Sequence, residues 1–248
     1  MAPLIAERTP HEPSEADAPL SRTERKKREK LGAIKRAARE LFARRGFKAT
    51  RTRDIAERAD IGAGTLFLYT SSKEELLVEI FLEELGSTLD AAFASMPGDA
   101  PLLDQLLHVF NAAIRYHEPD PELARVFVKE LTFVERRLKE RTDAFLRGWY
   151  ARMAAVIEQA QARHEFAKDV PALALARNCF ALYIFTLKTW LGGAHSRAES
   201  EKWLRESIGL HLRCAMPRKM RNPAQRAPEQ RSRPRTSKVK RGTDLVPG

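Results

Sequence analysis

The chain has 248 residues, of which 43% are hydrophobic and 31% are charged, and this is enough apolar material for one or two folded domains. A disulfide-stapled miniprotein and a wholly disordered chain are both excluded by this composition. The formal net charge is +11, so we expect an anionic partner, with nucleic acid the first candidate and anionic lipid the second.

The charge is unevenly distributed and divides the chain into four segments. The net charge is −3 over residues 1–20, +8 over 21–75, −2 over 76–216 and +8 over 217–248. The first and last segments have too few large hydrophobic residues to fold. We therefore predict a disordered leader at 1–20 and a basic disordered tail at 217–248, with folded domains at 21–75 and 76–216 between them.

Apolar residues recur at intervals of three and four across both folded segments, and no stretch alternates with period two. This pattern predicts an all-α fold. The first helix is expected over about residues 22–45, with Gly46 in a left-handed cap. Two short helices are expected near 52–59 and 63–69.

A longer helix is predicted to open at Ser72, whose hydroxyl can cap it, and to stop before Pro97. Capping residues also mark later helices: we expect Pro121 and Pro171 in first turns, and Ser196 with Glu199 in a capping box. Five further helices are predicted at about 100–117, 121–136, 140–164, 171–192 and 197–214.

Several kinds of site and location are disfavoured. The longest nearly apolar stretch, residues 179–187, is far shorter than the roughly 20 residues of a membrane span, and the first residues do not resemble a secretory signal. Cys179 and Cys214 form neither a CxxC pair nor a Cys/His cluster. We therefore predict a cytoplasmic protein without a disulfide framework, bound metal or cofactor.

The two short predicted helices have the layout of a helix-turn-helix. Ile55 and Ala56 of the first and Leu66 of the second lie on the inner side, and the turn falls at residues 60–62. The second helix is short enough to insert its N-terminal end into a major groove about 12 Å wide. The pattern indicates that the outward residues of this unit read DNA.

Residues 25–77 resemble the TetR family of bacterial transcriptional regulators. The family pattern begins with LF-x-x-x-G-[FY] and a threonine-rich start, continues with an IA pair and ends with GTLY-x-[YH]-F-x-[ST]-K-[ED]-x-L. The residues that match it at fixed spacing are Leu41-Phe42, Gly46-Phe47, Thr50, Ile55-Ala56, Gly64-Thr65-Leu66-Phe67, Tyr69, Ser72-Lys73-Glu74 and Leu76. The resemblance implies an N-terminal three-helix helix-turn-helix domain that binds DNA, followed by a larger helical domain for ligand binding and dimerisation.

The resemblance also implies individual roles in DNA binding. Arg53 matches a position that reaches a base edge, where its guanidinium can bond O6 and N7 of guanine. Arg51 replaces the usual capping Ser or Thr, so Thr50 is expected to cap and Arg51 to contact a phosphate. Positions that touch backbone phosphates are matched by Thr52, Thr65, Tyr69 and Lys73. Positions that approach the bases are matched by Ala63, Gly64 and Phe67. Leu68, where the family often has His or Tyr, is a further DNA-binding candidate.

Four basic residues at the start of the first helix, Arg25, Lys26, Lys27 and Arg28, are a further candidate. They can lie along the DNA backbone or in a minor groove as an arm. A solvated helix face is the alternative for these charges.

The resemblance implies that the second domain pairs two chains and binds a small molecule. Apolar stripes on the last two helices predict a dimer interface, made by Phe180, Ile184, Leu187, Leu191, Trp203 and Ile208. Packing of these stripes within one chain is the alternative. Aromatic residues predicted to line an apolar ligand cavity, with ordinary core packing as the alternative, are Phe81, Phe110, Phe127, Trp149 and Tyr183.

We therefore predict a transcriptional regulator, a ligand-responsive repressor that binds a palindromic operator in double-stranded DNA as a homodimer, with no membrane partner and no catalytic residues. A helical-bundle enzyme is the first alternative, but the chain has no Glu-x-x-His pair, no glycine-rich phosphate loop and no nucleophile beside a positioned base. The second alternative is a non-specific nucleic-acid or lipid-surface binder acting through the basic tail.

Overall fold

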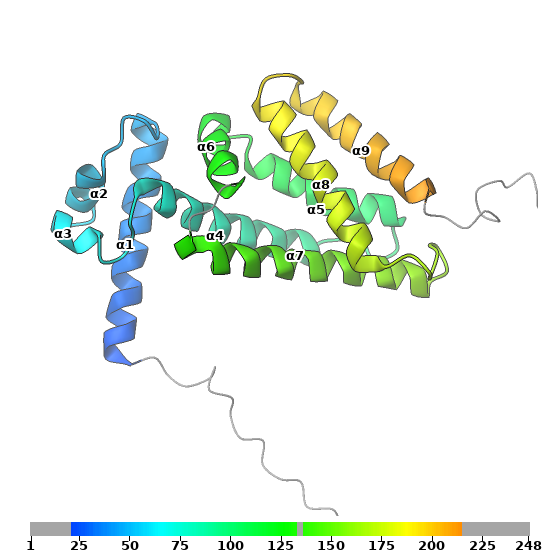
Figure 1. Cartoon of the computed structure of the whole chain (residues 1–248), viewed down its shortest axis with the longest axis horizontal. Helices are drawn as coiled ribbons and strands as arrows, with labels where there is room; N and C mark the ends of the chain where they lie inside the picture. The colour runs from blue at the N-terminus through cyan, green and yellow to red at the C-terminus, as the bar shows by residue number, and fades with distance from the viewer. Residues whose placement is uncertain (1–20, 133–135, 215–248) are drawn as a thin grey trace, which may run out of the picture.

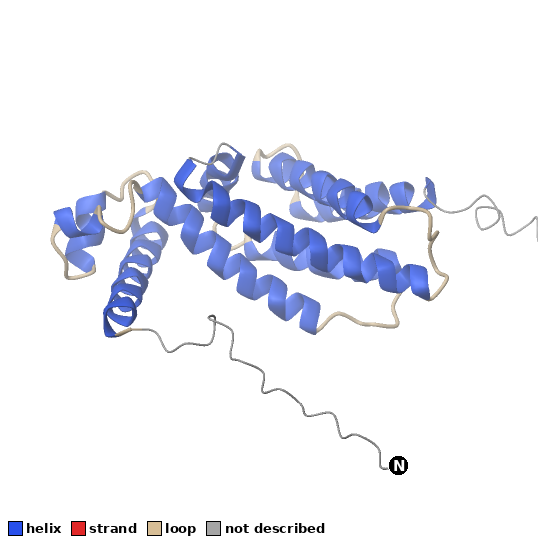
Figure 2. Ribbon diagram, turned by 60° about the horizontal axis from the view of Figure 1, so that its bottom comes forward, coloured by secondary structure: helices blue, strands red, loops and turns tan. Residues whose placement is uncertain are grey.

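The computed structural model describes residues 21–132 and 136–214, and these residues form nine α-helices and no strand (Figure 1, Figure 2). The predicted all-α fold is therefore confirmed. The predicted leader and tail lie outside the described residues. Within the described ranges, no helix is long and apolar enough to cross a membrane, and no group of His, Cys, Asp and Glu side chains has an arrangement suited to a metal ion.

The first three helices lie together at one end of the molecule (Figure 1): α1 (Arg22–Arg45), α2 (Thr52–Arg58) and α3 (Ala63–Leu66). The predicted bounds of α1 are confirmed, and Ile34, Leu41 and Phe42 are buried on its inner face. Gly46 has φ +78° and ψ 157°. The positive φ explains the glycine, but the extended ψ means that the predicted left-handed helical cap is wrong.

The fourth helix, α4 (Lys73–Ala94), connects this end to the rest of the chain. Ser72 caps it as predicted, because the Ser72 hydroxyl accepts a hydrogen bond from the Glu75 N–H at 3.0 Å. The Glu75 carboxylate accepts hydrogen bonds from the N–H and the hydroxyl of Ser71. The start of α4, directly after the helix-turn-helix, is thus held by hydrogen bonds on both sides of the cap.

The remaining helices form a bundle with α4 (Figure 2): α5 (Leu102–Tyr116), α6 (Pro121–Thr132), α7 (Arg136–Ala162), α8 (Ala172–Leu191) and α9 (Arg197–Cys214). Helices α5, α6 and α7 pack on α4, and α8 and α9 pack on these three. The predicted cap at Asp120 is confirmed by a 2.9 Å hydrogen bond from the Leu123 N–H to its carboxylate. The capping box of Ser196 and Glu199 is also confirmed. One contiguous core runs from α1 through α4 to α9.

Three of the predicted helix limits are wrong. The second short helix ends at Leu66 rather than at residue 69, because a turn follows over residues 67–69. α7 begins at Arg136, within the range expected for the preceding helix. Pro171 occupies the N-cap position of α8 instead of its first turn. In that position its carbonyl accepts the first hydrogen bond of the helix, from the Leu175 N–H at 3.1 Å.

Candidate nucleic-acid interface

The helix-turn-helix is held by a small apolar core. Ile55 and Ala56 of α2 and Leu66 of α3 are 0%, 1% and 1% exposed, as the sequence predicts. The turn between the two helices passes through Asp60, whose φ of +54° is a conformation that aspartate tolerates better than most L residues. The inner faces of α2 and α3 are therefore fixed, and their outer faces meet solvent.

Two ion pairs set the direction of α2 along α1. Arg45 lies 3.8 Å from Asp54, and Glu40 lies 2.6 Å from Arg58. The later residue of α2 therefore contacts the earlier residue of α1, so the two helices run antiparallel. The turn at residues 60–62 and the start of α3 consequently face the middle of α1, and the first half of α1 extends past them (Figure 1).

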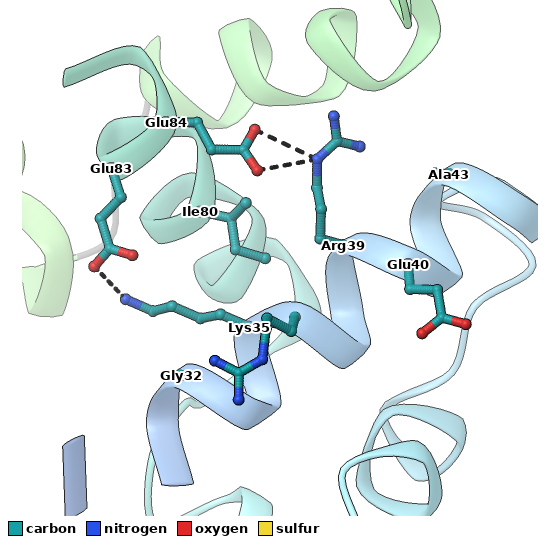
Figure 3. Close-up of a pocket in the computed structure, with 9 residues that line it drawn as sticks. Gly32, Lys35, Arg39, Glu40, Ala43, Ile80, Glu83 and Glu84 are labelled. Carbon is teal, nitrogen blue, oxygen red and sulfur yellow. Dashed lines mark hydrogen bonds and ion pairs between the residues drawn. The ribbon is translucent and has the colours of Figure 1, made fainter. Parts of the chain in front are cut away.

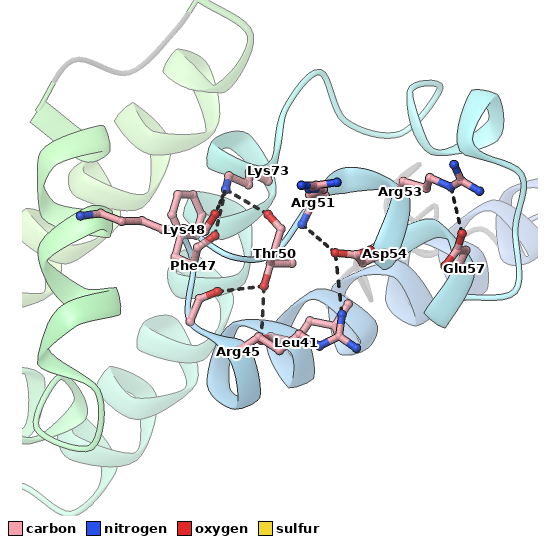
Figure 4. Close-up of polar contacts among 11 residues, drawn as sticks. Leu41, Arg45, Phe47, Lys48, Thr50, Arg51, Arg53, Asp54, Glu57 and Lys73 are labelled. Atoms are coloured by element: carbon pink, nitrogen blue, oxygen red, sulfur yellow. Dashed lines mark hydrogen bonds and ion pairs between the residues drawn. The ribbon is translucent and has the colours of Figure 1, made fainter.

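The loop between α1 and α2 is fixed by two side chains (Figure 4). Thr50 is 1% exposed, and its hydroxyl lies 2.9 Å from the Gly46 carbonyl. The Lys73 ammonium donates to the carbonyls of Phe47 and Thr50 at 2.9 and 3.0 Å, with the Lys48 carbonyl at 3.5 Å. It also lies 4.5 Å from the centroid of the Phe47 ring.

This geometry gives Lys73 a role inside the chain. A lysine ammonium has three N–H donors, and here they are directed at backbone carbonyls of the loop that leads into α2. Lys73 therefore positions the N-terminus of α2, and its predicted contact with a phosphate stays a prediction. Thr50 is not the cap of α2. The Asp54 carboxylate accepts from the Arg51 N–H at 3.1 Å instead.

The arginines predicted to contact DNA are exposed at the start of α2 (Figure 4). The Arg53 side chain is 82% exposed and forms a 3.0 Å ion pair with Glu57, one turn further along the helix. Arg51 is exposed as well, and Thr52 between them is half-buried. Lys48, which the sequence motif did not single out, lines a surface cleft together with Arg51 and Arg53. Its position two residues before Thr50 in a basic segment is the signal that could have identified it.

The residues predicted to contact DNA on and after α3 are also accessible. Phe67 and Leu68 are 52% and 74% exposed, which is unusual for large apolar side chains in a folded domain. A Cβ added at Gly64 would meet no atom within 4 Å, so the backbone there is open to a partner. Ala63 is exposed, whereas Thr65 and Tyr69 are half-buried.

The five aromatic residues predicted to line a ligand cavity are buried in the second domain. Phe81 stacks on Phe127 with ring centroids 4.7 Å apart, and Phe110 stacks on Tyr183 at 5.3 Å. These four rings belong to the closely packed core of the domain. The fifth, Trp149, contacts the Tyr183 ring at 5.4 Å and also lines a cleft.

That cleft lies between α4 and α7. Its apolar walls come from Leu89, Phe93, Phe145 and Trp149, and two glycines, Gly86 and Gly148, leave room between them. At its rim Arg152 pairs with Asp90 and lies 3.9 Å from the Phe93 ring centroid. The buried indole N–H of Trp149 has no hydrogen-bond partner among the described residues. The sequence offered no signal for Phe145 or for the glycines, because their convergence depends on how α4 and α7 pack.

An ion-pair network joins α1 to the second domain (Figure 3). Lys35 of α1 is 9% exposed, and its ammonium lies 3.0 Å from Glu79 and 2.6 Å from Glu83 of α4. Arg141 of α7 contacts the same two carboxylates. Burial alone would raise the pKa of Glu83, but the bonds from Lys35 and Arg141 outweigh it and lower that pKa.

A second branch of the network lies one turn away. Arg39 of α1 lies 3.2 Å from Glu84 of α4, and the Tyr116 hydroxyl of α5 donates to the same carboxylate at 2.7 Å. Burial, together with this bond to Glu84, raises the pKa of Tyr116. Helix α1 is therefore tied by charge to α4, and the same α4 carboxylates also bond to side chains of α5 and α7.

The predicted dimer residues divide into two groups. Leu187, Leu191 and Ile208 are 2%, 3% and 0% exposed and belong to the chain's own core, so their assignment to an interface is wrong. Phe180 and Ile184 are half-buried. Trp203 is 44% exposed and stacks on Phe185, which is 55% exposed and was not predicted.

Comparisons with known proteins agree with this architecture. Residues 34–80 match the family model of bacterial regulatory proteins of the tetR family. The chain is 23% identical over 167 residues to the fatty acid metabolism regulator protein of Bacillus subtilis, covering 67% of this chain and 86% of that one. It is 27% identical over 172 residues to the HTH-type transcriptional repressor KstR of Rhodococcus jostii, covering 69% and 77%.

Solved structures share the fold. FadR of Thermus thermophilus, solved as a TetR-family repressor in complex with lauroyl-CoA, superposes with a TM-score of 0.63 at 21% identity over 76% of this chain and 96% of that one. FadR of Bacillus subtilis, in complex with stearoyl-CoA, gives 0.59 at 20% identity over 73% and 97%. These structures show the shared fold, and the family match over residues 34–80, the curated regulators and the helix-turn-helix geometry identify the chain as a DNA-binding transcriptional regulator of the TetR family.

Proposed function

We propose that this regulator is a repressor that binds a two-fold-symmetric operator as a homodimer and releases it when a small molecule binds the second domain. The observation that carries the proposal is the outer face of α2 and α3, where Arg51, Arg53, Phe67 and Leu68 are exposed on helices whose inner faces are fixed. Exposed side chains on a rigid support are what base recognition requires.

The chemistry of these side chains suits a major groove. The Arg53 guanidinium can form two hydrogen bonds with guanine. Phe67 and Leu68 can pack on thymine methyl groups, and the open backbone at Gly64 allows close approach. The half-buried Thr52, Thr65 and Tyr69 supply hydroxyls for phosphates, which set the register of the protein on DNA without reading sequence.

The dimer interface that we propose is the exposed apolar surface of α8 and α9. Its members are the large hydrophobic side chains that the chain's own core leaves uncovered: Leu173, Phe185, Trp203 and Leu210. A two-fold dimer presents two copies of α3, so the operator is expected to be a near-palindrome with half-sites about 34 Å, or a multiple of that distance, apart.

The effector that we propose carries an apolar chain and enters the cleft between α4 and α7. The aromatic walls of the cleft support this class, as do Arg152 at its rim and the unpartnered N–H of Trp149. Long-chain acyl thioesters are the first compounds to test, because FadR structures of this fold hold lauroyl-CoA and stearoyl-CoA.

The route from effector to operator passes along α4. This helix begins directly after the helix-turn-helix, and it carries Glu79, Glu83 and Glu84, which bind α1 through Lys35 and Arg39. A tilt of α4 at the cleft would therefore move α1 and the DNA-contacting helices together. Such coupling typically amounts to about 1–3 kcal/mol and is reciprocal.

Selection of bound duplexes from a random pool tests the DNA-binding part. A near-palindrome is expected with the unaltered chain. Arg53→Ala is expected to relax the preference at one base pair in each half-site, because it removes a base contact rather than a phosphate contact. Equal losses of affinity on operator and random DNA would remove Arg53 from base recognition.

Titration of lauroyl-CoA into the free protein and into the protein–operator complex tests the effector part. Weaker binding to the complex, by the same factor by which the ligand weakens operator binding, is the expected result. A compound that binds both states equally cannot be the inducer.

A further inference from the structure

The first turns of α1 project beyond the rest of the DNA-binding domain (Figure 1). Every residue from 21 to 30 is exposed, and the first buried residue of the helix is Ile34. At 1.5 Å per residue, residues 22–30 form a rod about 13 Å long. This segment is helical without burying an apolar face.

Local interactions explain why the segment is helical. The Ser21 hydroxyl accepts from the Glu24 N–H at 3.2 Å, and the Glu24 carboxylate accepts from the Ser21 N–H at 3.0 Å, which together form a capping box. Arg25 and Glu29 form a pair with the i,i+4 spacing. Lysine, arginine and glutamate are also good helix formers.

The segment is strongly basic. Residues 22–30 hold six basic side chains and two acidic ones, Glu24 and Glu29, and the basic ones are Arg22, Arg25, Lys26, Lys27, Arg28 and Lys30. Like charges at neighbouring positions of a helix destabilise it by a few tenths of a kcal/mol per pair. The repulsion among these charges therefore lowers the stability of the helix, and a bound external anion would offset it.

The direction of α2 places this segment next to the proposed DNA interface. Because α2 runs antiparallel to α1, the turn that leads into α3 faces the middle of α1, and the projecting turns continue past it. A duplex that receives the start of α3 in its major groove and runs parallel to α1 would pass alongside residues 22–30.

One side of the segment is aligned with the inner face of α1. Lys30 and Lys27 precede Ile34 by four and seven residues, so they extend the line of the buried stripe toward the N-terminus, and Lys26 flanks them. The inner face of α1 is the one that packs against α2 and α4. The three arginines of the segment lie on the remaining sides of the helix.

We propose that residues 22–30 are a second DNA-contacting element, which lays Lys26, Lys27 and Lys30 against the phosphate backbone outside each half-site. The proposal rests on the proposed operator binding and extends its footprint. At about 3.4 Å per base pair, a rod of this length reaches about four base pairs. Because phosphates carry no sequence information, the element adds affinity without changing the preferred sequence.

Two triple variants with the same change of charge test this proposal in the full-length chain. One replaces Lys26, Lys27 and Lys30 with glutamine, and the matched control replaces Arg22, Arg25 and Arg28 with glutamine. Glutamine preserves helix propensity, and circular dichroism and thermal unfolding check that both variants fold. Affinity for the selected duplex is measured over a range of salt concentrations, together with a hydroxyl-radical footprint.

The lysine variant is expected to flatten the slope of log affinity against log salt by about 0.9 for each phosphate that a lysine no longer neutralises. It is also expected to lose protection at the outer edges of the footprint and to keep the same preferred sequence. The arginine variant is expected to change the slope less and to keep the full footprint.

An unchanged footprint in the lysine variant, or equal effects of the two variants, would overturn the proposal. The same holds if the lysine variant binds DNA normally but no longer sediments with phosphatidylglycerol vesicles, because the segment would then bind lipid. A different failure, in which the unaltered chain shows no preferred duplex, would count against the proposed operator binding itself.

Discussion

The two ends of the molecule differ in where their distinctive side chains lie. In the helix-turn-helix, Arg53, Phe67 and Leu68 are exposed, and the groups that support them are buried or bonded to backbone. In the bundle, Phe110 and Tyr183 are almost completely buried against each other. The same kind of residue, a large aromatic ring, is therefore open to solvent at one end and stabilises the core at the other.

Replacing a phenylalanine with alanine in each region makes this difference measurable, and it is the largest effect that we expect. Phe110→Ala should destabilise the protein by about 3–5 kcal/mol, because it leaves a cavity in a closed core. Phe67→Ala should change stability by about 0.5 kcal/mol or less and should weaken operator binding. Urea unfolding and a DNA-binding titration measure the two quantities. If Phe110→Ala had no effect on stability but abolished ligand binding, its ring would belong to a ligand site instead.

The sequence predicts the DNA-binding end well because its signals are local. The cap at Ser72 and the buried positions Ile55 and Leu66 each depend on residues a few positions apart, and the structure confirms them. The spacing of the helix-turn-helix motif likewise falls within one short segment.

Burial of residues in the bundle is harder to predict from the sequence, because it depends on which helices pack on each side of an apolar stripe. α8 packs against both α7 and α9, so Leu187 and Leu191, which form part of its most apolar stripe, face the chain's own core. Phe185, which stacks on the predicted residue Trp203, lies outside the apolar stripe that the sequence predicts for its helix. The role of Lys73 was missed for a similar reason, since its carbonyl partners lie 23–26 positions earlier in the chain.

A buried histidine in the bundle should make stability depend on pH. His117 is 2% exposed and packs among the rings of Phe81, Tyr116 and Phe127, and neither ring nitrogen has a hydrogen-bond partner among the described residues. Burial lowers the pKa of His117 to about 4. The unfolded chain, with a histidine pKa near 6.5, therefore binds more protons than the folded chain between about pH 6.5 and 4.

Because the unfolded state binds more protons in that range, this contribution to stability is present above pH 6.5 and is lost as the pH falls. The loss should be about 2 kcal/mol at pH 5, roughly 1.4 kcal/mol for each pH unit below 6.5. Urea midpoints of the unaltered chain, of His117→Phe and of the exposed control His164→Phe at pH 7.5 and pH 5 measure it. Equal pH dependence of the unaltered chain and His117→Phe would mean that the pKa of this histidine does not differ between the folded and unfolded chains.

Lys73 lies at the boundary between the two regions. Replacing it with methionine distinguishes a lysine that positions α2 from a lysine that contacts a phosphate. Methionine keeps an apolar stem but loses the bonds to the carbonyls of Phe47 and Thr50, so we expect a destabilisation of about 1–2 kcal/mol. Operator affinity should fall through displacement of α2, while the salt slope stays the same. Lys48→Met is the matched control, with little expected change in stability. A slope flatter by about 0.9 per protomer, without loss of stability, would restore the phosphate contact that the sequence suggested.

The smallest effect concerns the exposed ion pair between Arg53 and Glu57. An i,i+4 pair of this kind contributes about 0.3–0.5 kcal/mol, so Glu57→Gln should hardly change stability. Arg53 must leave Glu57 to reach a base, and Glu57 itself repels the phosphates. The substitution should therefore raise operator affinity roughly two- to threefold, a gain that salt reduces.

Two further variants decide where that gain arises. Glu122→Gln removes the same charge from α6, where the side chain is 83% exposed, and we expect little effect on DNA binding. In an Arg53→Ala background, Glu57→Gln should give a smaller gain than it does alone, because the competition for the guanidinium is gone and only the repulsion of phosphates remains. Equal gains in both backgrounds would mean that the ion pair does not compete with DNA and that Glu57 acts on the phosphates alone.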